Sequence, residues 1–194
     1  MRPLDPANGY EAAADEFIRR REGSSIGVAT VRAWAETLPP GASVLDLGCG
    51  SGAPISEVLH QAGLMVYAVE ASPTLAAAYR HRFPDALLAC ERVEDSRFFD
   101  RRFDAALAAG LLFLLPADAQ RATLRKLATV LTTGGRFLFT APAEPCRWSD
   151  VLTGRDSESL GAEAYRTLLA EAGLTVVAET EDEGGNHYYD AFRQ

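Results

Sequence analysis

Residues 44–52 read Val-Leu-Asp-Leu-Gly-Cys-Gly-Ser-Gly and constrain the fold more than any other stretch of the chain. Val44, Leu45 and Leu47 form an apolar run with the length of a buried strand, and glycines follow it directly. Glycine lets the backbone turn sharply and approach a ligand, because it has no side chain. Pro54 then stands at an early helix position, where its missing N–H costs nothing. Strand, glycine turn and helix together predict an α/β fold that presents backbone N–H groups to a nucleotide-like ligand.

The glycine spacing alone leaves two classes of cofactor open. Gly48-x-Gly50-x-x-Ala53 satisfies the relaxed dinucleotide fingerprint. The longer string Asp46-Leu47-Gly48-Cys49-Gly50-Ser51-Gly52 resembles motif I of the class I S-adenosylmethionine-dependent methyltransferases. The resemblance implies S-adenosylmethionine as cofactor, S-adenosylhomocysteine as product, and four cofactor-binding residues in this string, Asp46, Gly48, Cys49 and Gly50.

The end of the second predicted strand, residues 64–69, supplies a further cofactor contact. Glu70 follows this strand, where a carboxylate accepts hydrogen bonds from ribose hydroxyls both in dinucleotide sites and in the family that the motif resembles. A solvated charge at a strand end is the structural alternative. Because motif, spacing and residue type agree, we expect Glu70 to bind the ribose and Ala71 to lie beside the cofactor.

The loop at residues 90–96 follows the third predicted strand. In the family that motif I resembles, this loop covers the adenine, with an apolar residue offering its backbone N–H and a neighbouring acid accepting from the exocyclic amine. Val93 and Glu94 match these two positions, and Asp95 is the near alternative to Glu94. A plain acidic surface loop is the other interpretation, since acidic loop residues are usually solvated.

Hydrophobic periodicity predicts the remaining elements, and no linker or internal repeat interrupts them. We therefore expect a single domain, with a helical cap at residues 1–40 and a Rossmann-like core at residues 41–194. The resemblance implies a three-layer α/β sandwich with a seven-stranded, mostly parallel sheet whose strand seven is antiparallel. The predicted strands are 44–47, 64–69, 86–89, 103–110, 137–140, 174–179 and 186–192, and the predicted helices are 9–22, 25–38, 55–62, 73–82, 117–131 and 157–172.

The acceptor side is harder to locate from sequence. Residues 108–111, Ala-Ala-Gly-Leu, stand where nucleic-acid and amide-nitrogen enzymes of the resembled family carry Asn-Pro-Pro-Tyr or Asp-Pro-Pro-Tyr. This departure predicts an apolar wall, with Ala109 beside the cofactor. The irregular stretch 141–156 is long enough to be a functional loop, and we expect it to line the acceptor pocket and to be a candidate for a mobile lid.

Four side chains are candidates for acceptor contacts. Tyr10, Trp148 and Tyr189 are the candidate substrate residues, and His187 is the candidate general base. His187 and Tyr189 share a face of an extended strand, with Tyr188 opposite. A base is needed only when the acceptor holds its proton at neutral pH, as an alcohol does. Packing of Tyr10 and Phe17 in an apolar helix stripe is the alternative to a substrate role.

Charge and composition restrict the partners. The net charge of −8 disfavours nucleic acid, which usually requires a basic stripe. No segment approaches the ~20 apolar residues of a membrane span, so we expect no membrane association. The three cysteines fit neither a disulfide framework nor a zinc spacing, which predicts a cytoplasmic protein without a metal. The expected partner is a small-molecule acceptor, and the oligomeric state stays open.

Three functions are consistent with these patterns. The first is methyl transfer from S-adenosylmethionine to a small molecule by in-line displacement, driven by positioning. The second is a nicotinamide-dependent oxidoreductase, although no tyrosine has a lysine four residues later, as the short-chain dehydrogenases require. The third is a methyltransferase-like module that binds the cofactor without turnover.

Overall fold

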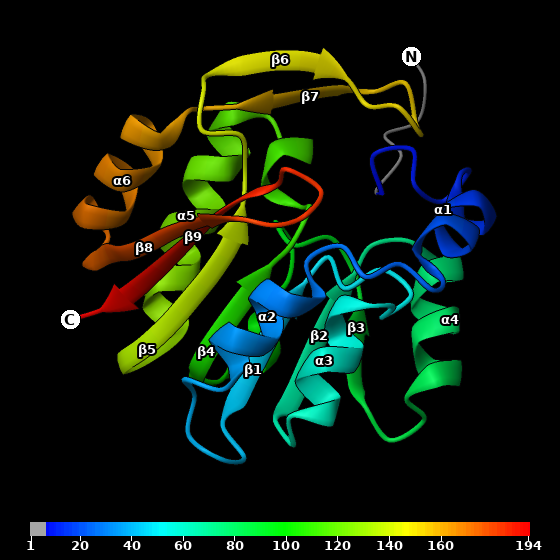
Figure 1. Ribbon diagram of the computed structural model, residues 1–194, viewed down its shortest axis with the longest axis horizontal. Helices are drawn as coiled ribbons and strands as arrows, with labels where there is room; N and C mark the ends of the chain where they lie inside the picture. Colours follow the sequence, from blue (N-terminus) through cyan, green and yellow to red (C-terminus); the bar gives the residue numbers. More distant parts are fainter. Residues whose placement is uncertain (1–6) are drawn as a thin grey trace.

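The computed structural model describes residues 7–194 and contains a seven-stranded sheet between layers of helices (Figure 1). The strand order is β3-β2-β1-β4-β5-β9-β8. Strands β1 to β5 are parallel, and β9 runs antiparallel to both of its neighbours. This arrangement confirms the predicted fold class. The strands are β1 (Ser43–Leu47), β2 (Met65–Glu70), β3 (Leu87–Cys90), β4 (Phe103–Ala108), β5 (Leu131–Thr140), β8 (Leu174–Glu181) and β9 (His187–Arg193).

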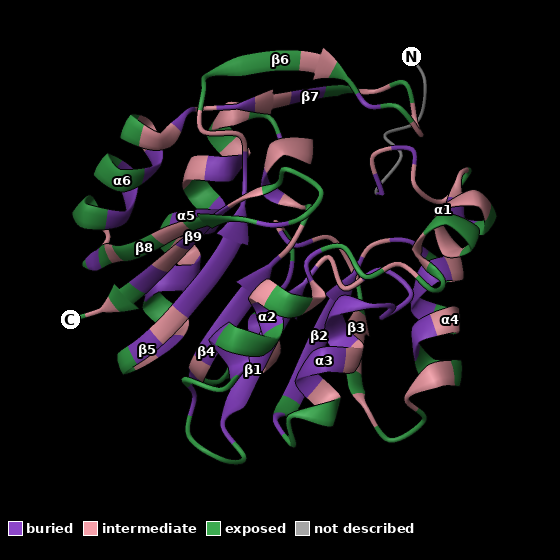
Figure 2. Cartoon of the chain, viewed as in Figure 1, coloured by how far each residue is buried: buried purple, intermediate pink, exposed green. Residues whose placement is uncertain are grey.

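Helices cover both faces of the sheet, and the central strands between them are buried (Figure 2). Helices α2 (Val28–Ala35) and α3 (Ile55–Gln61) pack on one face through a cluster that includes Val31, Trp34 and Leu59. Helices α5 (Ala117–Val130) and α6 (Ala162–Glu171) pack on the other face. The apolar spacing that predicted these helices therefore marks the faces that they bury.

Two further helices lie beside the β2–β3 side of the sheet. Helix α4 (Pro73–Arg82) begins as predicted, because the Ser72 hydroxyl caps it by accepting a hydrogen bond from the Leu75 N–H. Helix α1 (Ala14–Arg21) contacts α4 and is shorter than the predicted helix at 9–22. Short 3-10 helices, η1 (Phe98–Asp100) and η2 (Leu112–Leu114), flank β4. None of the helices within residues 7–194 is both long and apolar enough to cross a membrane.

Two sequence predictions need correction in this part of the fold. Strand β5 begins at Leu131 rather than at residue 137, because the pair Gly134-Gly135 lies inside the strand as a register irregularity opposite β4. Residues 157–159 are not the start of a helix. They form β7 (Asp156–Ser159), which pairs with β6 (Cys146–Ser149) as an antiparallel hairpin, and α6 begins only after Gly161 at a φ of +85°.

The order of the strands places the ligand crevice. The chain moves from β1 outward to β2 and β3, and then returns to the other side of β1 with β4. Open α/β sheets bind ligands outside the carboxyl ends of their strands at such a reversal. The site should therefore lie beyond the ends of β1, β2 and β4. Residues 7–13, which precede α1 and are called the N-terminal segment below, lie next to this place.

Candidate functional site

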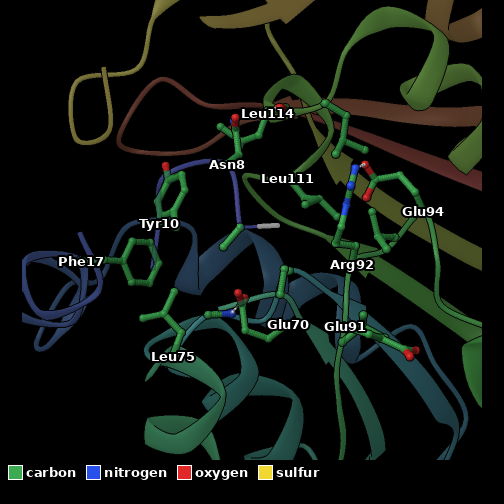
Figure 3. Close-up of a pocket in the computed structure, with 17 residues that line it drawn as sticks. Asn8, Tyr10, Phe17, Glu70, Leu75, Glu91, Arg92, Glu94, Leu111 and Leu114 are labelled. Carbon is green, nitrogen blue, oxygen red and sulfur yellow. Dashed lines mark hydrogen bonds and ion pairs between the residues drawn. The ribbon is translucent and has the colours of Figure 1, made fainter. Parts of the chain in front are cut away.

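A cavity lies at the carboxyl ends of these strands, with about 630 Å³ of space that no atom fills, part of it open to solvent. Its floor comes from the loops after β1, β2 and β3, and the N-terminal segment and the loop after β4 line the opposite side (Figure 3). The lining residues are Ala7, Asn8, Tyr10, Phe17, Gly48, Gly50, Val69, Glu70, Ala71, Leu75, Glu91, Arg92, Val93, Glu94, Leu111, Leu114 and Leu115.

The glycine turn after β1 forms a surface that only glycine fits. Gly50 has a φ of +59°, and a Cβ at this position would lie 2.9 Å from the Phe17 ring. Gly48 has a φ of +67°, and its Cβ would lie 3.1 Å from Leu111. L-residues rarely adopt such φ values. The turn therefore lets the side chains of Phe17 and Leu111 pack directly against its main chain at the edge of the cavity.

Glu70 joins the glycine turn to the start of α4. The side chain is 7% exposed, and its Oε2 accepts a hydrogen bond from the Gly50 N–H at 2.9 Å. Its Oε1 accepts from the Ser72 N–H at 2.8 Å. Burial raises the pKa of Glu70, and these backbone donors act in the opposite direction. Each carboxylate oxygen keeps a second lone pair, so Glu70 can also accept hydrogen bonds from a ligand in the cavity.

The loop after β3 forms another wall. Val93 and Glu94 line the cavity, whereas Asp95, the alternative to Glu94, does not. Arg92 forms an ion pair with Glu94, and Lys126 donates to the Glu94 carbonyl at 3.2 Å. Sequence reasoning missed Glu91, which follows β3 directly. The signal was available, because Glu70 is also a glutamate at the carboxyl end of a parallel strand, as the last residue of β2.

The N-terminal segment lies across the cavity and is tied to three parts of the fold. Asn8 donates through Nδ2 to the Leu114 carbonyl at 3.0 Å. Glu11 accepts hydrogen bonds at the start of α4 from the hydroxyls of Ser72 and Thr74, at 2.5 Å and 2.7 Å. The Tyr10 hydroxyl donates to Asp150 Oδ2 at 3.1 Å, which links this segment to the loop between β6 and β7.

Comparison with known proteins decides the family. The chain is 31% identical over 195 residues to the cypemycin N-terminal methyltransferase of a Streptomyces species, across 97% of this chain and 75% of the relative. Residues 44–135 match the family described as the methyltransferase domain. The chain belongs to the class I S-adenosylmethionine-dependent methyltransferases. This membership sets aside the nicotinamide-dependent oxidoreductase.

Solved structures agree with the methyltransferase fold. Magnesium protoporphyrin IX methyltransferase from Synechocystis PCC 6803, with bound S-adenosylhomocysteine, matches with a TM-score of 0.78 and 17% identity over 97% of each chain. The 1,6-didemethyltoxoflavin-N1-methyltransferase of Burkholderia thailandensis matches with a TM-score of 0.73 and 20% identity, over 100% of this chain and 93% of the other.

Three of the predicted cofactor residues of this methyltransferase lie outside the lining of the cavity. Asp46 is 2% exposed and its Oδ2 accepts from the Ser56 hydroxyl at 2.6 Å, so it faces α3; burial raises its pKa to about 6. The Cys49 sulfur lies 3.6 Å from the Gly50 carbonyl, and burial raises the pKa of the thiol. Ala109 packs against the α2–α3 core cluster. The other six, Gly48, Gly50, Glu70, Ala71, Val93 and Glu94, line the cavity.

Trp148 lies in a second hollow, which shares Asn8, Leu114 and Leu115 with the first cavity. It stands on β6, and its ring lies 5.4 Å from the ring of Phe113 in η2. Opposite it on β7 is Ser157, which is 2% exposed and has no hydrogen-bond partner for its hydroxyl among the described residues. Of the predicted acceptor residues of the methyltransferase, Tyr10 and Trp148 therefore lie in two hollows that share part of their lining.

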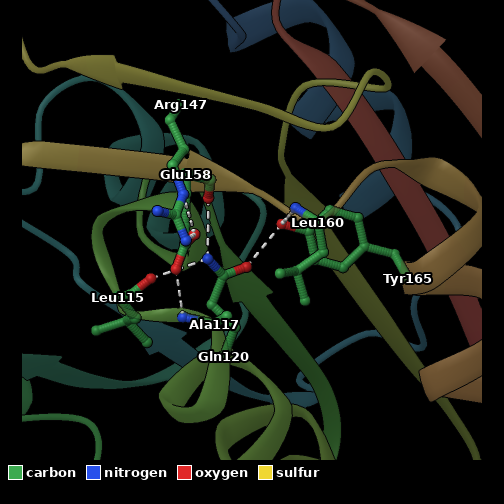
Figure 4. Close-up of polar contacts among 7 residues, drawn as sticks. All are labelled: Leu115, Ala117, Gln120, Arg147, Glu158, Leu160 and Tyr165. Carbon is green, nitrogen blue, oxygen red and sulfur yellow. Dashed lines mark hydrogen bonds and ion pairs between the residues drawn. The ribbon is translucent and has the colours of Figure 1, made fainter.

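The β6–β7 hairpin occupies much of the stretch predicted as an irregular loop, and it is tied to α5 (Figure 4). Glu158 accepts from the Ala117 N–H at 2.6 Å. Gln120 donates to the carbonyls of Glu158 and Leu115, each at 2.9 Å, and accepts from the Tyr165 hydroxyl at 2.7 Å. These bonds fix the hairpin beside the cavity.

His187 and Tyr189 lie away from both hollows, because β9 stands between β5 and β8. They share a face as predicted, with ring centroids 4.7 Å apart. His187 Nε2 lies 2.8 Å from Glu179 Oε2, and Tyr189 is fully buried against Phe139. The structure thus does not bring the candidate base of this methyltransferase to the cavity, and we leave both residues out of the proposed site.

Proposed function

We propose that this methyltransferase transfers the methyl group of S-adenosylmethionine to a small-molecule acceptor that binds between the N-terminal segment and the β6–β7 hairpin. One observation carries the proposal: a single cavity has the glycine turn and Glu70 on one side and an apolar wall on the other. The first side suits the cofactor and the second suits an acceptor.

The residues present fit the cofactor. The glycine turn brings the main chain of Gly48 and Gly50 to the cavity lining, and Glu70 offers free lone pairs to the ribose hydroxyls. Val93 would present its backbone to the adenine, and Glu94 or Glu91 would accept from the exocyclic amine. When bound, S-adenosylmethionine supplies an activated methyl group, so the protein has to align the acceptor and exclude water.

The acceptor would use the opposite wall and the second hollow. Leu111, Leu114 and Leu115 make this wall apolar, and Asn8 and Trp148 extend it towards the hairpin. The two hollows share Asn8, Leu114 and Leu115, so an acceptor in either would lie beside the same apolar wall. The net charge of −8 supports an acceptor other than nucleic acid.

A second candidate acceptor is the amino terminus of a peptide. The relative that is 31% identical to this chain is described as an N-terminal methyltransferase. The second hollow opens beside β6, whose residues are mostly exposed, and this leaves room for a chain longer than a small molecule.

The test is an acceptor screen with S-adenosylmethionine in which methylated product is identified by mass and S-adenosylhomocysteine is quantified. Gly50→Val serves as the control without a functional cofactor surface. Product from the wild type but not from Gly50→Val is the expected result. Cofactor binding without product from any acceptor would instead indicate a module that binds without turnover, and no binding would contradict the proposed site.

A further inference from the structure

Tyr10 is one of two polar residues, with Asn8, that the described N-terminal segment places in the lining of the cavity. Tyr10 lines the cavity between the glycine turn and the apolar wall, and its ring packs edge-on against Phe17 at 5.6 Å (Figure 3). Its hydroxyl lies 3.1 Å from Asp150 Oδ2. The proposed function gives this pair no role beyond tying two segments together.

The direction of this hydrogen bond is fixed. Asp150 is 8% exposed, and its Oδ1 already accepts from the N–H groups of Leu152 and Thr153 and from the Thr153 hydroxyl. An ionised carboxylate can only accept, so Tyr10 must donate its proton to Oδ2. Burial and the charge of Asp150 raise the pKa of Tyr10, so the hydroxyl keeps its proton, while the nearby Arg21 acts in the opposite direction. A hydroxyl that donates one hydrogen bond can also accept one, and Tyr10 lines the cavity in which a donor would bind.

The surrounding charge favours a donor that is basic. Glu70, Glu91 and Glu94 line the cavity, and Arg92, the one cationic lining residue within residues 7–194, is paired with Glu94. An alcohol would also donate to Tyr10, but it needs a base to take its proton, and Tyr10 already holds its own. An amine arrives largely as an ammonium ion, which gives its extra proton to water far more readily than an alcohol gives up its hydroxyl proton, so the nitrogen lone pair becomes free without a dedicated base.

We infer that Tyr10, oriented by Asp150, selects an amine acceptor by accepting a hydrogen bond from its N–H group. This inference rests on the proposed function. The amine lone pair forms the new N–C bond while the C–S bond of the cofactor breaks and its electron pair passes to sulfur. The proton in excess on the methylated nitrogen is then lost to water.

The chain offers a matched control. Tyr188 donates to Asp182 Oδ2 at 3.2 Å in the same kind of tyrosine–aspartate pair, but it lies outside the cavity lining. Tyr188→Phe removes an equivalent hydrogen bond without touching the acceptor. Asp150→Asn is the sharper variant, because the amide oxygen can keep the three bonds on the Oδ1 side while the amide N–H₂ donates to Tyr10. The tyrosine proton would then point into the cavity.

The experiment first measures S-adenosylhomocysteine binding to the wild type, so that failure of the proposed function is seen separately. It then compares two matched pairs of probes as acceptors, phenethylamine with 2-phenylethanol and alanyl-phenylalanine with lactoyl-phenylalanine. We expect methylation of at least one amine and of neither alcohol. Tyr10→Phe should lower kcat/KM for the amine about tenfold, and Asp150→Asn at least as much, with S-adenosylhomocysteine affinity unchanged and Tyr188→Phe like the wild type.

Three results would overturn the inference while leaving the proposed function intact. One is methylation of an alcohol as fast as its matched amine, which would mean that the pair relays a proton. Another is binding of S-adenosylhomocysteine with no amine of the two pairs methylated. The third is a loss in Tyr10→Phe that Tyr188→Phe reproduces, which would make the hydroxyl merely structural.

Discussion

The two halves of the cavity are held together in different ways. On the cofactor side, the bond that defines the site joins the Gly50 N–H to Glu70, which are 20 positions apart in one strand-turn-helix-strand unit. On the acceptor side, the bond between Tyr10 and Asp150 spans 140 positions. The cofactor half is main chain that a local motif shapes, and the acceptor half depends on contacts between side chains far apart in the sequence. A local motif can be recognised in a sequence, whereas a contact between distant residues cannot.

The first prediction concerns the cofactor half, where a side chain is added to the main chain of the glycine turn. Gly50→Val places a branched side chain at a φ of +59°, where even a Cβ would lie 2.9 Å from the Phe17 ring. We expect loss of S-adenosylhomocysteine binding by at least ~100-fold, or about 3 kcal/mol, measured by calorimetry.

Gly63→Val is the matched control for this prediction. Gly63 has a φ of +72°, but nothing lies within 4 Å of the position that its Cβ would take. It therefore carries similar backbone strain without the clash, and cofactor affinity should match the wild type. Equal loss in both variants would show that strain, and not the surface of the cavity, is responsible.

Asp46 belongs to motif I, but its side chain faces α3 and does not line the cavity. A change at Asp46 should therefore alter stability more than cofactor binding. The pKa of Asp46 is about 6 in the folded protein against an ordinary 3.8, so the folded state prefers the protonated form. The stability that Asp46 contributes is therefore complete below pH 3.8 and is lost as the pH rises through 6. We expect Asp46→Asn to be more stable than the wild type by about 3 kcal/mol at pH 8.

That advantage should shrink towards zero near pH 4, as followed by urea unfolding across the pH range. A stability difference between Asp46→Asn and the wild type that stays the same at every pH would contradict the raised pKa of Asp46. Asp46→Asn should change cofactor affinity less than Gly50→Val does, because Asp46 does not line the cavity.

Glu70 tests the polar part of the cofactor half. Glu70→Gln keeps the size of the side chain but turns one end into a donor that faces the N–H of Gly50 or Ser72. We expect S-adenosylhomocysteine binding to weaken by about 1–3 kcal/mol. The affinity is measured by calorimetry, and an unchanged affinity would show that Glu70 does not bind the ribose.

Trp148 gives the smallest expected effect and tests the acceptor half alone. Trp148→Ala removes a ring that packs against Phe113 and lines the second hollow. We expect the KM for a methylated acceptor to rise severalfold, or about 1 kcal/mol, with cofactor affinity unchanged. A change in cofactor affinity instead would show that the two halves are not separable.

The same division explains what could be predicted from the sequence. Motif I and the apolar runs indicated the sheet and its helices, because each depends on neighbours in the chain. Ser72 and Pro73 marked the start of α4 for the same reason. The β6–β7 hairpin was missed because its strands are short and because Glu158 and Gln120, which hold it, are separated by 38 positions. His187 and Tyr189 were predicted as acceptor residues from the alternation of side chains along a strand. This alternation does not show how far β9 lies from the crevice.

Of the two glutamates at the carboxyl ends of β2 and β3, only one was predicted from the sequence to bind the cofactor. Glu70, the last residue of β2, was predicted to bind the cofactor, whereas Glu91, the first residue after β3, was not, and Glu94 was chosen instead. Leu114 and Asn8 carry no recognisable signal, since a leucine and an asparagine in loops are common. Their place in the site follows from the hydrogen bond between them, which only the fold reveals.

The proposed cofactor site is tested most directly by a crystal structure of the protein with S-adenosylhomocysteine. We expect the ribose hydroxyls within hydrogen-bond distance of the Glu70 carboxylate, the homocysteine sulfur on the side of the cavity that Tyr10 and Leu111 face, and the second hollow free of cofactor atoms. S-adenosylhomocysteine in another hollow, or a ribose that does not touch Glu70, would contradict the proposed site.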